Sequence, residues 1–198
     1  MTGVFRRAIL AFPFLLAACG SEEDDASQAP MAFPPLHFDY LPPLQLNVAT
    51  IEIQQRFMPS GVAPDVSAQA PVSPAAALRA MAKDRLQALG GSGRAVFAIL
   101  DASLIRKQDT IRGSMAVSLT IFDSTAVQRG YATATVERTS TGKTANLKSG
   151  LYELTKLMMD AMNVEFEFQV RRNLKEWLTS AAAPGTPVLQ DTLSQPRR

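Results

Sequence analysis

The sequence predicts an α+β domain in which an antiparallel sheet of about four strands carries two helices on one face. Residues 111–121 alternate between apolar and polar side chains, which is typical of a strand with one wet face. Apolar residues recur at helical spacing over 74–89 and again over 145–178. The expected element order is β-α-β-β-β-α over residues 46–179, a length that can bury one core.

The first strand is predicted for residues 46–54, with a bulge where the alternation slips between Val48 and Ile51. The first helix is expected over residues 74–89. Ser73 can cap it, a proline occupies its first position, and two glycines follow its last residue.

Three further strands are expected to form an antiparallel meander. They cover residues 94–105, 111–121 and 130–139. Since side chains alternate along a strand, Met115, Val117 and Leu119 share one face, and we expect that face to be in the core. It is expected to meet Leu78 and Met81 of the first helix.

The first residues have the layout of a secretory signal. Arg6 and Arg7 precede an apolar run over 8–16 that is shorter than the roughly 20 residues a membrane-spanning helix needs. The run ends in Leu16-Ala17-Ala18-Cys19, which resembles the lipobox of bacterial lipoproteins. The resemblance implies that Cys19 is acylated, becomes the first mature residue and anchors the chain to a membrane through its acyl chains. Gly20 in the next position implies the outer membrane, facing the periplasm.

The predicted organisation has four parts. These are a signal peptide over 1–18, a lipidated, proline-rich tether over 19–45, the domain over 46–179 and a disordered tail over 180–198. Removing the signal lowers the count of Lys plus Arg from 20 to 18, which balances the 18 acidic residues and argues against a nucleic-acid partner.

Metal and cofactor chemistry are not expected. Cys19 is the only cysteine and His37 the only histidine, so an internal disulfide and a Cys/His zinc cluster are excluded. The sequence predicts no metal ligands and no cofactor.

The element order, the tether and the lipobox together resemble small auxiliary lipoproteins of Gram-negative envelope transport, such as the LPS-assembly lipoprotein LptE and the PqiC-type partner of lipid-transport systems. This resemblance is one of architecture and implies no particular binding residues. Three runs also resemble a lipoprotein family without an assigned function. They are Asp84-Arg85-Leu86 through Phe97, Asp101-Ala102-Ser103 and 162–168.

No catalytic residues are predicted. The run 139–144 ends like a phosphate-binding loop but lacks its first glycine, and no nucleophile elbow is present. His37 lies in the tether. Asp101, Asp123 and Asp160 are expected at a strand end, a turn and a helix face, where structural roles are the default. The chain is therefore not expected to be an enzyme.

The last helix carries more apolar residues than one face needs. Its core residues form two stripes that are rotated relative to each other, so we expect the helix to bend, to break near Asn163 or to change what it packs on. Leu157, Val164 and Phe168 form an additional stripe. Either the sheet and the first helix cover this stripe, or it docks a partner protein or an acyl chain.

The function expected from these observations is that of a lipid-anchored, non-catalytic binding or assembly factor of the cell envelope, which contacts another envelope protein or an amphiphile. Two alternative functions fit the same sequence observations. One is a peptidoglycan-associated or synthase-activating lipoprotein, and the other is an envelope hydrolase of an unrecognised type.

Overall fold

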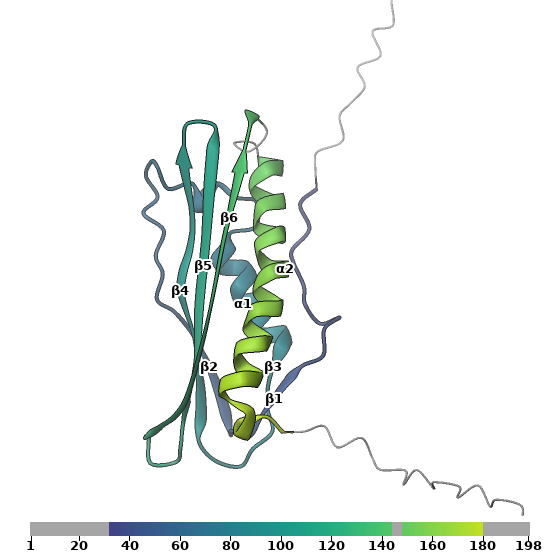
Figure 1. Cartoon of the computed structure of the whole chain (residues 1–198), viewed down its shortest axis with the longest axis vertical. Coiled ribbons are helices and arrows are strands. Elements are labelled where there is room, and N and C mark those ends of the chain that lie inside the picture. Colours follow the sequence, from purple (N-terminus) through teal and green to yellow (C-terminus); the bar gives the residue numbers. More distant parts are fainter. Residues whose placement is uncertain (1–31, 144–147, 180–198) are drawn as a thin grey trace, which may run out of the picture. The chain divides into compact units, whose positions relative to one another are not determined.

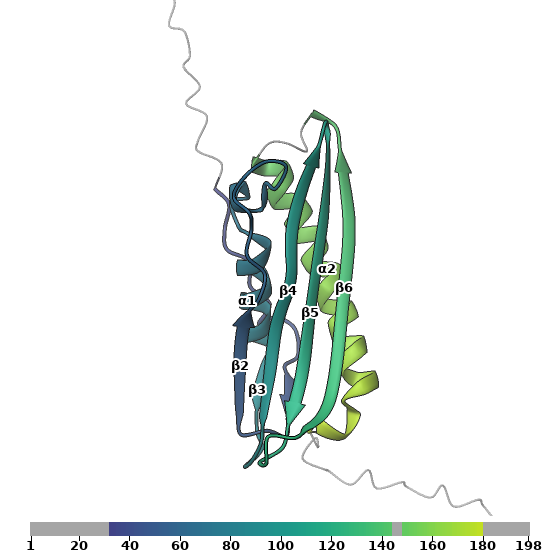
Figure 2. The ribbon, with the colours of Figure 1, turned by 90° about the vertical axis from the view of Figure 1, so that its left-hand side faces the viewer.

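The computed structural model describes residues 32–143 and 148–179. A four-stranded sheet, ordered β2-β4-β5-β6, carries both helices on one face, and a small β1-β3 sheet lies beside them (Figures 1 and 2). The strands are β1 (Leu44–Leu46), β2 (Thr50–Gln55), β3 (Leu86–Ala88), β4 (Arg94–Lys107), β5 (Thr110–Phe122) and β6 (Gln128–Thr141). The helices are α1 (Pro74–Arg85) and α2 (Lys148–Asn173), with 3-10 turns η1 (Ser67–Gln69) and η3 (Lys175–Trp177). The predicted α+β class is confirmed.

The sheet is mixed, which corrects the prediction that it is antiparallel throughout. Strands β4, β5 and β6 form the expected antiparallel meander. Strand β2, however, pairs parallel with β4. The loop after β2 and helix α1 together make a crossover long enough to return the chain in the same direction.

The predicted first strand is two strands in two sheets. The alternation slips because the chain bends at residues 47–49, between β1 and β2, where a bulge was predicted. Val48, in the middle of this bend, is buried. Helix α1 begins as predicted, with the Ser73 hydroxyl accepting the N–H of Ala76, but it ends at Arg85. The next three residues leave the helix because their backbone pairs with β1.

A bulge in β4 lets both halves of this long strand face the core. The register with β5 shifts between Ile99 and Asp101. Strict alternation would put Phe97 and Leu104 on opposite faces, yet both are fully buried in one core cluster. The extra residue, Leu100, is partly exposed.

The core lies between the sheet and the helices. Helix α1 lies mainly over β4 and β2, whereas α2 lies over β6 and β5. Helix α2 is continuous through Asn163, so it does not break there. The residues of both predicted stripes from Leu151 to Leu174 are buried. The two stripes therefore pack on different neighbours along one helix. Leu147 and the predicted helix start at 145 lie outside the described residues.

Two glycines allow α2 to approach the sheet. A Cβ atom on Gly113 would overlap the Met158 side chain, and one on Gly130 would lie 2.5 Å from Leu174 Cδ2. A larger residue at either position would require the Met158 or Leu174 side chain to move.

The segment before β1 packs on the helices, so the tether predicted to reach residue 45 stops earlier. The Phe33 and Tyr152 rings lie 5.4 Å apart, and the Tyr152 hydroxyl donates to the Pro34 carbonyl oxygen. Phe38 is buried, and its N–H donates to Asp84. The packed part of the chain therefore includes residues 33–43.

Val117→Asp tests this core. Val117 is fully buried, so an unpaired carboxylate there should lower the free energy of unfolding by at least about 3 kcal/mol. Thr135→Asp, on the exposed face of β6, is the matched control and should change it by less than about 0.5 kcal/mol. Urea unfolding followed by circular dichroism measures both, and equal midpoints for the two variants would show that the register described here is incorrect.

Candidate functional site: the Arg85 network and the outer face of α2

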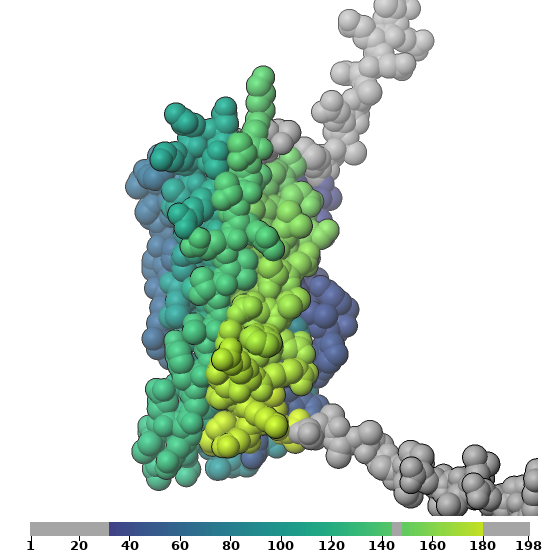
Figure 3. Space-filling view, in the orientation of Figure 1, coloured from purple at the N-terminus to yellow at the C-terminus, as the bar shows by residue number. Residues whose placement is uncertain are grey.

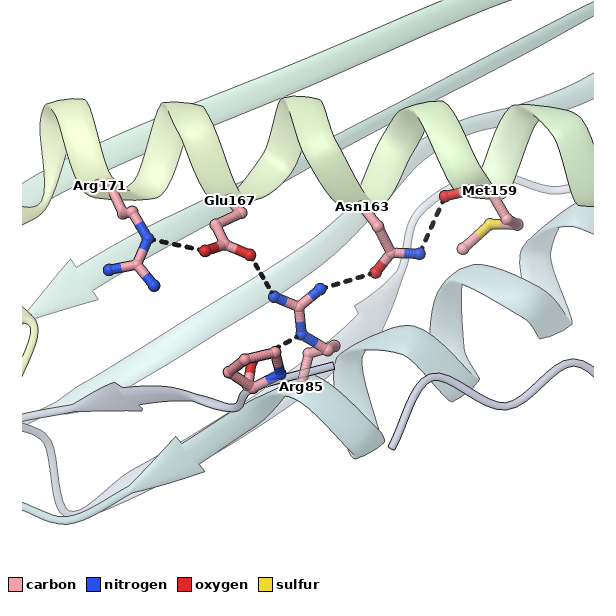
Figure 4. A network of polar contacts seen from close by, with 6 residues as sticks. Arg85, Met159, Asn163, Glu167 and Arg171 are labelled. Carbon is pink, nitrogen blue, oxygen red and sulfur yellow. Dashed lines mark hydrogen bonds and ion pairs between the residues drawn. The ribbon is translucent and has the colours of Figure 1, made fainter. Parts of the chain in front are cut away.

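A buried arginine joins three parts of the helix layer. The Arg85 side chain, at the end of α1, is 1% exposed. Its Nε donates to the Pro42 carbonyl oxygen at 3.0 Å, Nη1 donates to Asn163 Oδ1 at 3.0 Å, and Nη2 donates to Glu167 Oε2 at 2.6 Å (Figure 4). All three guanidinium nitrogens are therefore bonded, as a buried cation requires.

The acceptors of Arg85 are positioned by α2. Asn163 and Glu167 are four residues apart, so their side chains project from the same side of the helix. The Asn163 amide nitrogen donates to the Met159 carbonyl oxygen, which fixes the amide oxygen toward Arg85. Glu167 also accepts a hydrogen bond from Arg171 at 2.8 Å. The network fixes how α2 is rotated about its own axis.

These bonds shift the titration of Glu167. Partial burial alone raises the pKa of this carboxyl group. Hydrogen bonds from Arg171 and Arg85, with the attraction of the two guanidinium charges, lower it by more, so the pKa lies below its usual 4.5. Because the folded pKa is the lower one, the carboxylate stabilises the fold above about pH 4.5 and loses this effect as the pH falls through the lowered pKa.

Glu167→Gln should therefore destabilise the protein in a pH-dependent way. We expect a loss of roughly 2 kcal/mol at pH 7, because an amide is a weaker partner for a buried guanidinium. The difference from the unmodified protein should shrink as the pH falls below about 4.5. Glu137→Gln, which breaks an exposed ion pair with Arg112, is the control and should have almost no effect. Urea unfolding at several pH values measures this, and a difference that does not vary with pH would contradict the role of the Glu167 charge.

The predicted additional stripe on α2 is open to solvent. Leu157 is 59% exposed, Val164 73% and Phe168 54%. Neither the sheet nor α1 covers these side chains. Figure 3 shows the outer surface of α2 uncovered between β6 and the segment before β1. We call Leu157, Ala161, Val164 and Phe168 the α2 strip; Ala161 completes the row and is half-buried.

The α2 strip points away from the domain. At 100° per residue it is centred about 130° around the helix from the buried row of Met158, Met162 and Phe166. A hollow of about 610 Å³ continues its first end toward β6. The hollow is lined by Arg138, Thr139, Ser140, Ser149, Gly150, Glu153, Leu154 and Leu157.

The charges around the strip are acidic along its length and basic at its end, where the exposed Arg171 and Arg172 follow Phe168 by three and four residues. The twelve residues from Leu157 to Phe168 contain Asp160, Glu165 and Glu167 and neither lysine nor arginine. Glu167 is neutralised by the Arg85 network. The other two carboxylates flank the strip, one on each side of the helix.

The carboxylates considered for catalysis are not brought together. Asp101 lies within β4 and Asp160 on the exposed face of α2. Asp123 organises the β5–β6 turn. It accepts hydrogen bonds from Thr125, Arg129 and the Val127 N–H, and these lower its pKa, with the Thr125 hydroxyl contributing most.

Within the part of the chain that the structure describes, His37 and the carboxylates do not gather into a metal site. The His37 side chain is exposed on the segment before β1, and Cys19 lies outside the described residues. Within residues 32–143 and 148–179, no group of three or more His, Cys, Asp and Glu side chains could hold a metal ion.

The sequence analysis did not identify the Arg85 network. A signal was present, because Leu78, Met81 and Arg85 recur at helical spacing, so Arg85 falls on the buried side of α1. A charged residue in such a row needs a buried partner. Which residue supplies it depends on the tertiary fold.

Comparison with protein-family models and with curated proteins finds no match to this chain. Among the helices in the described part of the chain, none is long and apolar enough to cross a membrane.

Proposed function

We propose that this protein is a lipid-anchored, non-catalytic docking factor of the bacterial envelope. In this proposal, acyl chains on Cys19 hold it at the outer membrane, and the α2 strip binds a partner protein on the periplasmic side. The observation that carries the proposal is the exposure of Leu157, Val164 and Phe168 in one row of a helix whose other large apolar residues are buried or half-buried.

The composition of the strip supports a binding role. An isolated exposed leucine is normal on a protein surface, but a contiguous apolar row marks an interaction site. Phe168 and Leu157 are large enough to act as anchors in a partner's pockets. The Arg85 network holds α2 in the rotation that presents them, so the surface is preformed and binding would lose little conformational entropy.

The flanking charges do not select between a protein and a membrane amphiphile. Anionic headgroups would repel Asp160 and Glu165 but attract Arg171 and Arg172 at the end of the strip. The architectural resemblance to auxiliary transport lipoproteins agrees with a role in assembly, although it supplies no partner.

Site-specific photo-cross-linking in the cells that make this protein tests the proposal. A photoreactive amino acid replacing Phe168 in the lipidated chain should form a discrete adduct with one envelope protein. The same group at Tyr131, which is 47% exposed on the opposite face of the sheet, is the control and should not form that adduct.

Cys19→Ser supplies the second arm of the experiment. Without its acyl chains, the protein should leave the membrane fraction and the Phe168 adduct should be lost, because anchoring provides roughly 0.8 kcal/mol per buried methylene. Equal labelling from positions 168 and 131 would contradict the docking surface. Membrane retention of the Cys19→Ser variant would contradict the anchor.

A further inference from the structure

We infer that a basic hollow between β1 and the end of α2 binds the phosphate group of an anionic ligand. The hollow measures about 650 Å³. One wall comes from the chain around β1, with Pro42 and Gln45, and the other from the end of α2 and the residues after it, with Arg171, Lys175 and Thr179. The inference adds a ligand site to the molecule and does not rest on docking at the α2 strip.

Hydrogen bonds hold the two walls together. The Asn47 N–H donates to the Trp177 carbonyl oxygen at 2.8 Å, and the Thr179 N–H donates to the Gln45 carbonyl oxygen at 2.9 Å. The Pro42 carbonyl oxygen accepts from Arg85, which also bonds α2. The hollow is therefore formed before a ligand arrives, so binding would cost little conformational entropy.

Two cations share the hollow and keep donors for a ligand. Arg171 Nε donates to Glu167 Oε1 at 2.8 Å, and Figure 4 shows the two Nη atoms of Arg171 on the side away from Glu167. Within residues 32–143 and 148–179, no side chain pairs with these Nη atoms or with the Lys175 ammonium group. The bond to Glu167 thus orients the guanidinium without using the edge that carries both Nη atoms.

The charge balance at the hollow is positive. Glu167 lies between Arg85 and Arg171, so these three residues together carry one positive charge, and Lys175 adds a second. The described residues that line the hollow include neither aspartate nor glutamate. Arg171 and Lys175 are four residues apart, a spacing at which like charges repel. An anion between them replaces this repulsion with attraction to both.

The helix dipole is the alternative explanation for these cations, because it favours any cation near the end of a helix. It applies equally to Arg172, which is exposed in the last turn of α2 but is not among the described residues that line the hollow. A phosphate site needs the cations that share the hollow. Arg171 and Arg172 therefore separate the two explanations.

The donors of the hollow match a phosphate monoester better than a carboxylate. A phosphate monoester carries a charge of about −1.5 to −2 at pH 7 and has three strong acceptor oxygens. It can pair with both cations and accept from the Gln45 carboxamide or the Thr179 hydroxyl, which also line the hollow. A carboxylate has one charge and would leave one cation unmatched. Pro42 and Leu178 offer apolar contact to the group that bears the phosphate.

Protection of Lys175 from acetylation tests the site in the full lipidated chain. The protein is placed in phosphatidylcholine vesicles, treated with an acetylating N-hydroxysuccinimide ester at constant ionic strength, and analysed by mass spectrometry. Inorganic phosphate should slow acetylation of Lys175 in a saturable way and leave Lys156, an exposed lysine of α2, unchanged. Acetate at the same ionic strength should protect Lys175 at least tenfold more weakly.

Two variants locate the binding groups. Arg171→Gln should raise the phosphate concentration needed for half-protection roughly tenfold, because it removes a charge-assisted bond. The matched control is Arg172→Gln, which removes the same charge from the next residue and should change that concentration less than twofold. Both side chains are exposed, and thermal unfolding verifies that each variant is folded.

A second arm identifies the source of the phosphate group. Protection by inorganic phosphate in solution indicates a soluble phosphate ester as the ligand. Protection that appears only when the vesicles contain phosphatidic acid, and that Arg171→Gln weakens, indicates a lipid headgroup. No protection from either source would overturn the inference, as would equal protection by acetate or an equal loss in Arg171→Gln and Arg172→Gln. None of these outcomes bears on docking at the α2 strip, which the Phe168 cross-link tests.

Discussion

The arrangement of the helix layer depends on one buried guanidinium. Arg85 is the only described residue that bonds α1, α2 and the segment before β1 at the same time. A buried cation is costly unless it is paired and hydrogen-bonded, so arrangements that lack these three acceptors are strongly disfavoured. The acceptors are a backbone carbonyl oxygen at Pro42 and two side chains one turn apart on α2. The interaction therefore determines how the helices are oriented more than it raises the free energy of unfolding.

That geometry determines which face of α2 is exposed. With Asn163 and Glu167 turned toward Arg85, the buried row faces the sheet and the α2 strip faces solvent. Gly113 and Gly130 leave room for the Met158 and Leu174 side chains between the helix layer and the sheet. The exposed α2 strip and the buried core are thus two consequences of the same rotation of α2.

The sequence was sufficient to predict the meander, the start of α1, the middle of α2 and the apolar row of Leu157, Val164 and Phe168, because periodicity reports burial directly. The last helix was predicted to reach residue 178 but ends at Asn173, and the 3-10 turn η3 follows it. It was insufficient for segments whose local pattern is compatible with both a helix and a strand. Leu86 and Leu89 satisfy a helical period, yet pairing with β1 draws residues 86–88 into a strand. The parallel pairing of β2 and the partners of Arg85 depend on contacts between distant segments, which no local period encodes. The exposure of the strip likewise followed only from the completed fold.

Hydrogen exchange of the Arg85→Met protein tests whether Arg85 organises the helix layer. Methionine keeps an unbranched apolar stem and removes the guanidinium group with its charge. We expect lost protection at the N–H groups of Asn47 and Thr179, which bond to the carbonyl oxygens of Trp177 and Gln45 and so join β1 to the segment after α2. Protection of β5 and β6 should be retained. Unchanged protection at Asn47 and Thr179, or an equal loss throughout the sheet, would contradict the claim that Arg85 organises the helix layer.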